Sequence, residues 1–277
     1  MPFYGYVNGT IQPVEDIGIG VTDLGLLRGF GLFDYFLTYN GQPFQWDLYW
    51  ERFANSARRM TLEMPVTKDQ THAILLDLLA RSGEANVAFR FVMTGGYAPD
   101  SISIVAPNLL ILTEPIHPIP DQQYEQGIRV MLDDYVRDMA EVKSTDYKRI
   151  MLLAGAMRGA GVQDALYHKD GEISELSRSN IFLVMGNRLV TPNRHILYGI
   201  TRRTIIDLAR PDFEIEERPV LLSDLYDADE AFTTSSNKKV LPIVQIGDFR
   251  LGDGKVGPVS KTLLTRFRVF ADSWGAK

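Results

Sequence analysis

Hydrophobic and polar positions alternate in two short stretches near the N-terminus, and an Asn-Gly pair interrupts each stretch. The pairs are Asn8-Gly9 in FYGYVNGTIQPV and Asn40-Gly41 in FLTYNGQPFQW. Alternation of this kind is typical of strands that bury one face, and Asn-Gly favours the tight turn of a hairpin. We therefore predict a β-hairpin around each pair.

The pattern changes to helical spacing in DLYWERFANSARRM, residues 47–60. Apolar side chains recur there every three or four positions and form one stripe, which predicts an amphipathic helix. Arg52 lies opposite the stripe, so this spacing alone predicts that it faces solvent. A second helix is predicted around 73–79, with its end near Gly83, because glycine is common just after the last turn of a helix.

Two strands are predicted next. In NVAFRFVMTGG, residues 86–96, the large apolar side chains share one face and Arg90 lies on the other. An arginine in such a strand needs an anionic partner. NLLILTEP, residues 108–115, is almost continuously apolar, which indicates a strand that is buried on both faces.

Three prolines in TEPIHPIPDQQ indicate a stiff, extended connection between domains. We predict an N-terminal domain over 1–113, a linker over 114–123 and a larger C-terminal domain over 124–277. Strands and helices are mixed on both sides, so the expected fold is two α/β lobes. The C-terminal elements are predicted at 127–134 (strand), 150–162 (helix), 164–175 and 181–192 (hairpins), 201–210 (helix) and 230–234 (strand).

Composition narrows the classes of function. The chain has 277 residues, 45% of them hydrophobic and 23% charged, and a net charge of −6. A surface that binds nucleic acid is usually basic, so no nucleic-acid partner is expected. No apolar stretch approaches the roughly 18 residues of a membrane-spanning helix, and no signal peptide is recognised. We therefore expect a soluble, cytoplasmic protein without a membrane partner.

Several catalytic chemistries lack their motifs. The chain has no cysteine, and its 4 histidines are scattered, so no metal site is expected. The sequence contains no P-loop, H-E-x-x-H or G-x-S-x-G motif. Nucleotide hydrolysis through a P-loop, zinc proteolysis and α/β-hydrolase chemistry are accordingly not indicated.

Three other features of the sequence could together form one binding site. Lys143 in EVKSTDYKR could supply an amine, and Glu175 in SELSRSN a carboxylate. The helix start at Gly199 and the hydroxyl-rich loop SSNKK could bind a phosphate through backbone N–H groups. These are the parts that pyridoxal 5′-phosphate requires. The residues alone leave the alternative open, in which Lys143 and Lys148 are both ordinary surface charges.

The sequence resembles the fold-type IV pyridoxal-phosphate enzymes over nearly its whole length. KSTDYK, GVQDALYHKDGEISELSRSNIFLVMGNRLVTP and LYGITRRTIIDLA carry the resemblance in the C-terminal half. VTDLGLLRGFGLFDYF is similar to the family stretch D-x-G-x-x-x-G-x-G-x-F-E, and DLYWERFANSA to its H-L-x-R-L-x-x-S-A helix. The family includes branched-chain aminotransferases, D-amino acid aminotransferases and aminodeoxychorismate lyases. The resemblance implies a two-lobed fold whose larger lobe has a mixed, barrel-like sheet.

The resemblance also assigns roles to individual residues. It implies that Lys143 forms the Schiff base, that Glu175 binds the pyridine nitrogen, and that Lys148 has no catalytic role. Tyr147 is expected near the phenolic oxygen of the cofactor. The phosphate ligands implied by the family's motifs are Arg52, Ile200, Thr201, Ser235 and Ser236. For Arg52, we follow the resemblance, which implies a phosphate ligand, and not the helical spacing, which predicts a solvated side chain.

Three arginines are candidates for binding the substrate carboxylate, since a guanidinium can hold a carboxylate through two hydrogen bonds. They are Arg28, Arg90 and Arg178; the alternative for each is a structural ion pair. The Tyr-x-Arg-Pro motif typical of branched-chain enzymes is absent from the strand that contains Arg90. The Arg-x-His motif of well-known D-amino acid aminotransferases is absent as well. KSTDYK is somewhat more similar to the D-specific group.

The expected function is transamination between a D-amino acid and a 2-oxo acid, either 2-oxoglutarate or pyruvate. A branched-chain L-amino acid aminotransferase and an aminodeoxychorismate lyase are the alternatives, and a non-catalytic domain that keeps the fold is a third. In this family the loop that contains Arg28 usually reaches the neighbouring subunit's site. The resemblance therefore implies a homodimer with shared active sites.

Overall fold

The structure is a computed structural model, and it describes residues 3–100 and 102–276. Contacts within the chain divide it into two compact units. Unit 1 comprises Met1–His117, Val142–Asp146 and Ala271–Lys277, and unit 2 comprises Pro118–Glu141 and Tyr147–Phe270. The first change of unit falls inside the proline-rich segment, but two short later segments also belong to unit 1. A single boundary between two continuous stretches does not describe this division.

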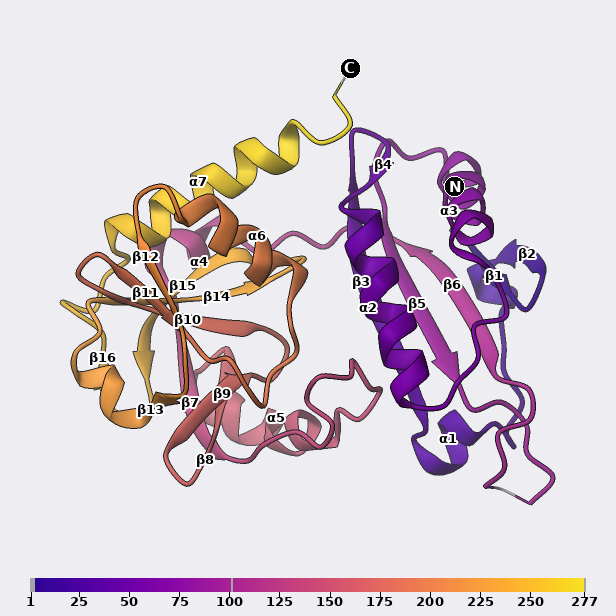
Figure 1. The fold of residues 1–277 in the computed structure, drawn as a ribbon, viewed down its shortest axis with the longest axis horizontal. Coiled ribbons are helices and arrows are strands. Elements are labelled where there is room, and N and C mark those ends of the chain that lie inside the picture. Colours follow the sequence, from indigo (N-terminus) through magenta and orange to yellow (C-terminus); the bar gives the residue numbers. More distant parts are fainter. Residues whose placement is uncertain (1–2, 101, 277) are drawn as a thin grey trace. The chain divides into compact units, whose positions relative to one another are not determined.

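Unit 1 is built on a six-stranded antiparallel sheet with the strand order β2-β1-β6-β5-β3-β4 (Figure 1). The strands are β1 (Tyr4–Val7), β2 (Thr10–Pro13), β3 (Gly31–Tyr39), β4 (Gln42–Pro43), β5 (Ala88–Thr94) and β6 (Asn108–Glu114). The helices are η1 (Val14–Asp16), α1 (Leu24–Arg28), α2 (Trp46–Arg59) and α3 (Lys68–Ser82).

Both predicted N-terminal hairpins are present, as β1–β2 and β3–β4. Asn8 and Gly9 have φ values of 45° and 101°, and Asn40 and Gly41 have φ values of 48° and 69°. Positive φ at both central residues is the geometry of the tight hairpin turn that Asn-Gly favours. Local sequence therefore determines these two turns.

The core of unit 1 contains a cluster of aromatic rings among its aliphatic side chains. Phe89 and Phe91 of β5 are 0% and 1% exposed, and Phe36 of β3 is 0% exposed. Phe53 of α2 lies edge-on to Phe91, with 5.2 Å between the ring centroids. Figure 1 shows α2 running along β3 and β5, so its apolar stripe covers this face of the sheet. Burial of each such ring contributes about 1.5–3 kcal/mol.

Unit 2 contains a ten-stranded mixed sheet with the order β12-β11-β10-β14-β15-β7-β8-β9-β13, and β16 pairs with β15. Its parallel pairs are β7–β8, β15–β7 and β11–β12. The strands are β7 (Ile128–Asp134), β8 (Asp164–Lys169), β9 (Glu172–Leu176), β10 (Asn180–Met185), β11 (Arg188–Thr191), β12 (Glu214–Glu217), β13 (Val220–Leu221), β14 (Glu230–Ser235), β15 (Lys239–Ile246) and β16 (Phe249–Arg250).

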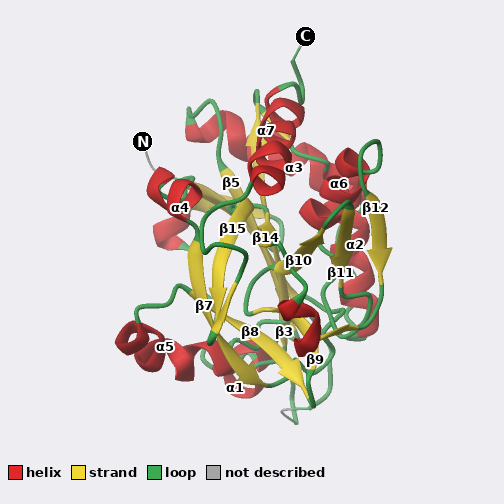
Figure 2. Cartoon of the chain, turned by 90° about the vertical axis from the view of Figure 1, so that its left-hand side faces the viewer, coloured by secondary structure: helices red, strands yellow, loops and turns green. Residues whose placement is uncertain are grey.

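The two ends of this sheet are neighbours in the sequence. β12 ends at Glu217 and β13 begins at Val220, so only Arg218 and Pro219 separate them. Terminal strands joined by so short a link must approach each other, which curls the sheet towards a barrel. The expected mixed, barrel-like core of the larger lobe is confirmed. Figure 2 faces these strands, with α4 and α5 at the left and α6 at the right.

The helices of unit 2 lie around this sheet. They are α4 (Asp121–Gln126), α5 (Lys148–Ala160), α6 (Ile200–Ala209), α7 (Pro258–Asp272) and η2 (Leu222–Tyr226). The expected linker is not extended throughout, because α4 begins inside it. Pro120 is the N-cap of α4, and proline is tolerated where a helix begins because the first N–H groups have no intrahelical partner. Composition alone therefore missed this short helix.

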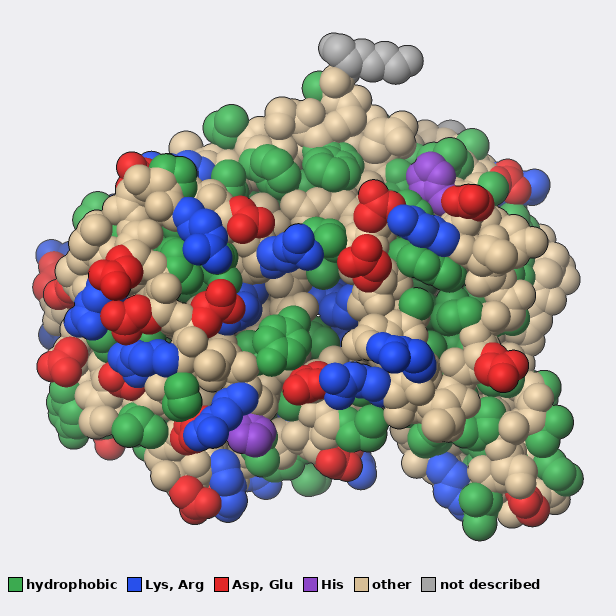
Figure 3. Space-filling model, viewed as in Figure 1, with side chains coloured by type: hydrophobic (Ala, Val, Ile, Leu, Met, Phe, Trp, Pro, Cys, Tyr) green, Lys and Arg blue, Asp and Glu red, His purple; other side chains and the backbone are tan. Residues whose placement is uncertain are grey.

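Acidic and basic side chains are interspersed on the face of unit 2 visible in Figure 3. Among the described helices, none combines the length and the apolar character needed to cross a membrane.

Candidate functional site

Lys143 belongs to unit 1, where β3 holds its backbone. Ser144 forms a β-bridge with Leu32, and the N–H of Phe33 donates to the carbonyl of Lys143 at 2.8 Å. The Nζ of Lys143 lies 4.5 Å from the centroid of the Phe33 ring. The lysine is therefore placed by a strand far away in the sequence, and its stem and amine lie along an aromatic face.

Close packing beside Lys143 accounts for one glycine of the D-x-G-x-x-x-G-x-G pattern. A Cβ at Gly31 would lie 3.0 Å from the carbonyl oxygen of Met93 and 3.2 Å from Oγ1 of Thr145. The N–H of Thr145 donates to the carbonyl of Gly31 at 2.9 Å. A side chain at this position would push the segment that contains the lysine away from β3.

Arg52 is not the solvated residue that helical spacing predicts. Its side chain is 11% exposed, and its Nε and Nη2 donate to the two carboxylate oxygens of Asp34 at 2.9 and 2.6 Å. Asp34 is 1% exposed and lies on β3, one residue after Phe33. The prediction of a solvated Arg52 is wrong, because an acidic partner on the sheet holds the guanidinium against unit 1.

Arg90 has an acidic partner, as its position in the strand requires. Its guanidinium binds both carboxylate oxygens of Glu114 on β6, with 2.9 Å between Nη2 and Oε2. It also lies over the rings of Tyr35 and Phe33, with its Cζ 5.2 and 6.0 Å from their centroids. Arg90 and Lys143 therefore contact the same aromatic ring, Phe33.

Arg28 is exposed at the last turn of α1, and its Nη1 donates to the carbonyl of its neighbour Leu27 at 3.0 Å. Arg178 is also exposed, in the turn between β9 and β10 of unit 2. These two arginines lie at surfaces, in contrast to Arg90, which an ion pair holds in place.

Glu175 lies on β9 in unit 2 and is 4% exposed. Its Oε1 accepts a hydrogen bond from Nε of Arg137 at 2.8 Å. Its Oε2 accepts from the backbone N–H of Leu197 at 3.0 Å and from Nδ2 of Asn180 at 3.3 Å. A buried carboxylate with three donors keeps a fixed orientation.

Arg137 was missed by the sequence analysis. Burial would lower the pKa of this guanidinium, but the Glu175 carboxylate outweighs burial and raises it. For the Tyr147 hydroxyl, by contrast, burial itself raises the pKa; this hydroxyl lies near the charges of Arg137 and Glu175. Tyr147 therefore stays neutral at ordinary pH. The segment DDYVRDM offers no motif for Arg137, and only the pairing of β7 with β8 and of β8 with β9 brings it to Glu175.

The start of α6 lies beside Glu175. Asn180 donates from Nδ2 both to Glu175 and to the carbonyl of Leu197, at 2.8 Å for the latter. Gly199 is the N-cap of α6 and provides no capping side chain, so the first-turn N–H groups of Ile200 and Thr201 are not capped in this way. A Cβ at Gly199 would lie 2.2 Å from Oδ1 of Asn180, so only glycine fits.

The hydroxyl-rich loop after β14 is tied to the same region. The side chain of Thr233 donates to the carbonyl of Asn180 at 2.8 Å, and Asn180 pairs with Thr234 in the sheet. Ser235 accepts from the N–H of Lys238 at 3.2 Å through its Oγ. Unit 2 thus brings together Glu175, the start of α6 and the loop that contains Ser235 and Ser236.

This part of unit 2 fits a phosphorylated pyridine cofactor. An uncapped helix start attracts a phosphate through its N–H groups and its dipole. Oγ1 of Thr234 is buried and has no hydrogen-bond partner among the described residues, directly before Ser235. A buried hydroxyl of this kind needs a partner, which a bound ligand can supply.

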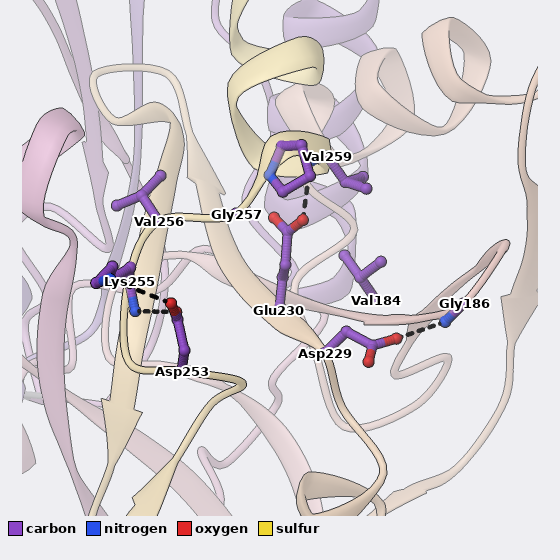
Figure 4. Close-up of a pocket in the computed structure, with 10 residues that line it drawn as sticks. Val184, Gly186, Asp229, Glu230, Asp253, Lys255, Val256, Gly257 and Val259 are labelled. Atoms are coloured by element: carbon purple, nitrogen blue, oxygen red, sulfur yellow. Dashed lines mark hydrogen bonds and ion pairs between the residues drawn. The ribbon is translucent and has the colours of Figure 1, made fainter.

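Two open hollows contain none of the candidate residues. One, of about 510 Å³, is in unit 2 around Glu230 and Gly257 (Figure 4). Glu230 accepts hydrogen bonds there from the N–H groups of Val259 and Ser260 at 2.9 Å each, which caps α7. The other, of about 580 Å³, is in unit 1 beside Trp46. No group of three or more acidic or histidine side chains that could bind a metal occurs in the described part of the chain.

Comparison with known proteins supports the same interpretation. A protein of Methanocaldococcus jannaschii, provisionally named branched-chain-amino-acid aminotransferase, is 30% identical over 281 residues, which cover 98% of each chain. A D-alanine aminotransferase of Staphylococcus haemolyticus is 26% identical over 275 residues, which cover 97% of this chain and 98% of that protein. The branched-chain amino acid aminotransferase of Escherichia coli is similar in fold, with a TM-score of 0.91, 24% identity, and 99% and 98% of the two chains covered.

The family assignment does not depend on any one of these proteins. The sequence model described as amino-transferase class IV matches residues 31–246, which include Lys143 and Glu175. Enzymes of this class use pyridoxal 5′-phosphate, the cofactor that the donors in unit 2 fit. The chain therefore belongs to the class IV aminotransferases and is a pyridoxal-phosphate enzyme.

Proposed function

We propose that this aminotransferase moves an amino group between a D-amino acid and a 2-oxo acid such as 2-oxoglutarate or pyruvate. The observation that carries the proposal is the position of Arg90. Its guanidinium and the amine of Lys143 contact the same Phe33 ring, and the branched-chain motif is absent from its strand. A substrate carboxylate can be held there beside the reactive amine. We also propose a cytoplasmic location.

The bound cofactor supplies an aldehyde that condenses with amines and a ring that withdraws electrons. We propose that Lys143 is the amine bound to it in the resting enzyme. With the cofactor bound, the free amine of Lys143 would be the group that accepts the α-proton of the substrate and gives a proton back. An ammonium could not accept that proton, so Lys143 must act as the neutral amine.

Glu175 has the complementary role of holding a proton at the pyridine nitrogen. Its ionised state follows from its pairing with Arg137, at 2.8 Å between Nε and Oε1. A negative oxygen beside the ring nitrogen favours the protonated ring. By keeping that ring protonated, Glu175 would help it to accept negative charge from the α-carbon of the substrate.

The remaining cofactor contacts follow from the family motifs. We propose that Ile200 and Thr201 bind the phosphate through the start of α6, and that Ser235 and Ser236 bind it through the loop after β14. Arg52 is the proposed charged phosphate ligand, held by Asp34 at 2.6 Å.

Tyr147 and two further arginines complete the proposed site. The neutral hydroxyl of Tyr147 is suited to a hydrogen bond with the phenolic oxygen of the cofactor. Arg28 and Arg178 are exposed, so they can reach a substrate carboxylate without leaving a buried partner. We propose them as additional carboxylate ligands.

A branched-chain L-amino acid aminotransferase is the second candidate. The supporting observation is the Methanocaldococcus jannaschii relative, which has a higher identity, 30%, than the 26% of the Staphylococcus haemolyticus D-alanine aminotransferase. Differences this small do not separate substrate stereochemistry. A direct assay of both classes of amino acid is therefore needed.

The test is a steady-state panel of D- and L-glutamate, D- and L-alanine, and D- and L-leucine, each with 2-oxoglutarate or pyruvate. We expect turnover of the D forms. Turnover of L-leucine and L-glutamate alone would contradict the D-specific proposal and support the branched-chain alternative. Release of pyruvate from aminodeoxychorismate without an amino acceptor would instead identify a lyase.

We also propose a homodimer. Helix α5 contains no buried residue, and Met151 and Leu152 on it are 73% and 78% exposed. Adjacent large apolar side chains with such exposure are typical of a surface that another chain covers. A second copy of this chain is the proposed occupant, as the family resemblance implies.

A further inference from the structure

A buried ion pair lies next to the proposed phosphate loop in unit 2. The Nζ of Lys238 is 2.5 Å from Oδ2 of Asp164, and the two side chains are 12% and 1% exposed. Removing two charges from water is costly, and an apolar pair of similar size is often equally stable. A pair retained in such a place is therefore better explained by what it positions than by its contribution to stability.

Lys238 is held from three directions. Its Nζ also donates to Oγ of Ser179 at 2.9 Å, and its N–H donates to Oγ of Ser235 at 3.2 Å. Its carbonyl accepts from the hydroxyl of Tyr124 at 3.1 Å. One residue thus connects the loop after β14 with the turn between β9 and β10 and with helix α4.

Asp164 anchors the other end of the pair to the same turn. It lies at the start of β8, and its Oδ1 accepts a hydrogen bond from the hydroxyl of Ser177. The N–H of Ser177 in turn donates to the carbonyl of Ala165 at 3.0 Å. Ser177 follows Glu175 by two residues, so the pair fixes the turn that begins at the end of the Glu175 strand.

We propose that Lys238 is a positioning residue for the cofactor phosphate. Through Asp164 and Ser179 it holds the Ser235–Ser236 loop at a fixed place relative to the turn after Glu175. The loop is then ready to receive the phosphate while Glu175 receives the ring nitrogen. This inference rests on the proposed function, because it assumes that Ser235 and Ser236 bind the phosphate.

The structure also explains why loss of Lys238 should weaken binding of the cofactor's phosphate group only. Glu175 itself is held by Arg137, Leu197 and Asn180, none of which contacts Lys238 in the described network. Loss of Lys238 should therefore release the loop without releasing the carboxylate. Pyridoxal, which lacks the phosphate, provides the comparison.

The experiment titrates the cofactor-free full-length protein with pyridoxal 5′-phosphate and, separately, with pyridoxal, following the absorbance of the bound aldehyde. For Lys238→Met we expect the dissociation constant for pyridoxal 5′-phosphate to rise about 10- to 100-fold. This is the range found when residues that orient metal ligands are replaced. The dissociation constant for pyridoxal should stay within about twofold of the wild-type value.

Two further variants keep the test decisive. The single change leaves Asp164 buried without its partner, so Asp164→Asn with Lys238→Met removes both charges and is expected to fold. It should show the same selective loss of phosphate-dependent affinity. Lys169→Met is the matched control, because Lys169 lies on β8 like Asp164 and forms an ion pair with Asp134 of β7 at 2.9 Å, but is 57% exposed. This variant should bind both aldehydes normally.

The possible outcomes separate this inference from the proposed function. A double variant that binds pyridoxal 5′-phosphate as tightly as the wild type would overturn the role of Lys238 but not the proposed function. Equal losses for the two aldehydes would also overturn it, since the effect would not act through the phosphate. A wild-type protein that binds neither aldehyde would overturn the proposed function together with the inference.

Discussion

The Nε of Arg137 donates a hydrogen bond of 2.8 Å to Oε1 of Glu175, and both side chains are largely shielded from water, with exposures of 12% and 5%. A guanidinium is charged at all ordinary pH values, so it keeps the neighbouring carboxylate ionised. The pair forms within unit 2 from residues of the chain itself. The negative charge that we propose for the ring nitrogen is therefore in place before the cofactor binds.

Glu175→Gln should lower kcat about 100-fold or more, the scale of a lost proton-transfer or proton-holding group. An amide is nearly the same size as the carboxylate but cannot hold a proton at the ring nitrogen by its charge. Single-turnover kinetics with a D-amino acid would measure the effect. Glu172→Gln is the control, because Glu172 lies on the same strand and binds Arg194 at the surface. Unchanged kcat in Glu175→Gln would contradict the assigned role.

Lys143→Ala should abolish both turnover and the adduct that borohydride traps between protein and cofactor, because no other amine is assigned to that bond. Lys148→Ala should leave both largely intact, since Lys148 is exposed at the first turn of α5. Mass spectrometry of the reduced proteins checks the prediction. A trapped adduct that disappears in Lys148→Ala but remains in Lys143→Ala would reverse the assignment.

Arg90→Gln should raise KM for the amino acid about 10-fold or more, because a charge-assisted hydrogen bond contributes about 1.5–3 kcal/mol. Affinity for pyridoxal 5′-phosphate should not change. Arg81→Gln is the matched control, since its ion pair with Asp77 lies on α3 of the same unit and is 48% and 45% exposed. Reduced thermal stability with an unchanged KM would show that the Arg90–Glu114 pair is purely structural.

Met151→Asp on α5 should convert the proposed dimer to a monomer, because it places a charge at the centre of an exposed apolar surface. Light scattering coupled to size-exclusion chromatography measures the mass directly. Val269→Asp is the comparison, because Val269 is 66% exposed on α7. A variant at Met151 that keeps the mass of the wild type would exclude α5 as the interface.

Stability in acid should depend on Asp164. Burial would raise the pKa of its carboxyl, but the Lys238 ammonium and the Ser177 hydroxyl outweigh burial and hold the pKa below the ordinary value of 3.8. A lowered folded-state pKa gives stability that is complete above the unfolded pKa and is lost as the pH falls through the folded one.

Asp164→Asn should therefore lower the free energy of unfolding at pH 7 by about 3–5 kcal/mol, the usual cost of breaking a buried pair. The difference from the wild type should shrink as the pH falls below about 4. Urea unfolding between pH 7 and pH 3 measures it, with Asp134→Asn as the exposed comparison. A difference that grows in acid would contradict the assigned direction.

Features set by neighbouring residues could be predicted from the sequence. The turns at Asn8-Gly9 and Asn40-Gly41 follow from local backbone preference, and the end of α3 at Gly83 follows from its αL conformation. The family followed from the order of several motifs along the chain, and the roles that we propose for Lys143 and Glu175 rest on the same motifs. In each case the information lies within a short stretch or in its spacing.

Features set by contacts between distant segments could not be predicted. Helical spacing describes apolar residues, so it left Arg52 in solvent although Asp34 on β3 holds it. Arg137 lies in no motif and gains its role only because the sheet brings it to Glu175. The Lys238–Asp164 pair joins residues that pair only through the fold. Charged partners of this kind follow from topology, which residue patterns do not specify.

The short terminal strands of both sheets have a consequence for behaviour at high concentration. β2 and β12 have 4 residues each, and β4 and β13 have 2 each. Amyloid-like growth starts from long, flat edges whose backbone groups can pair with another molecule. These edges provide few such groups, so the native protein should resist fibril formation, and contacts between copies should depend on side chains.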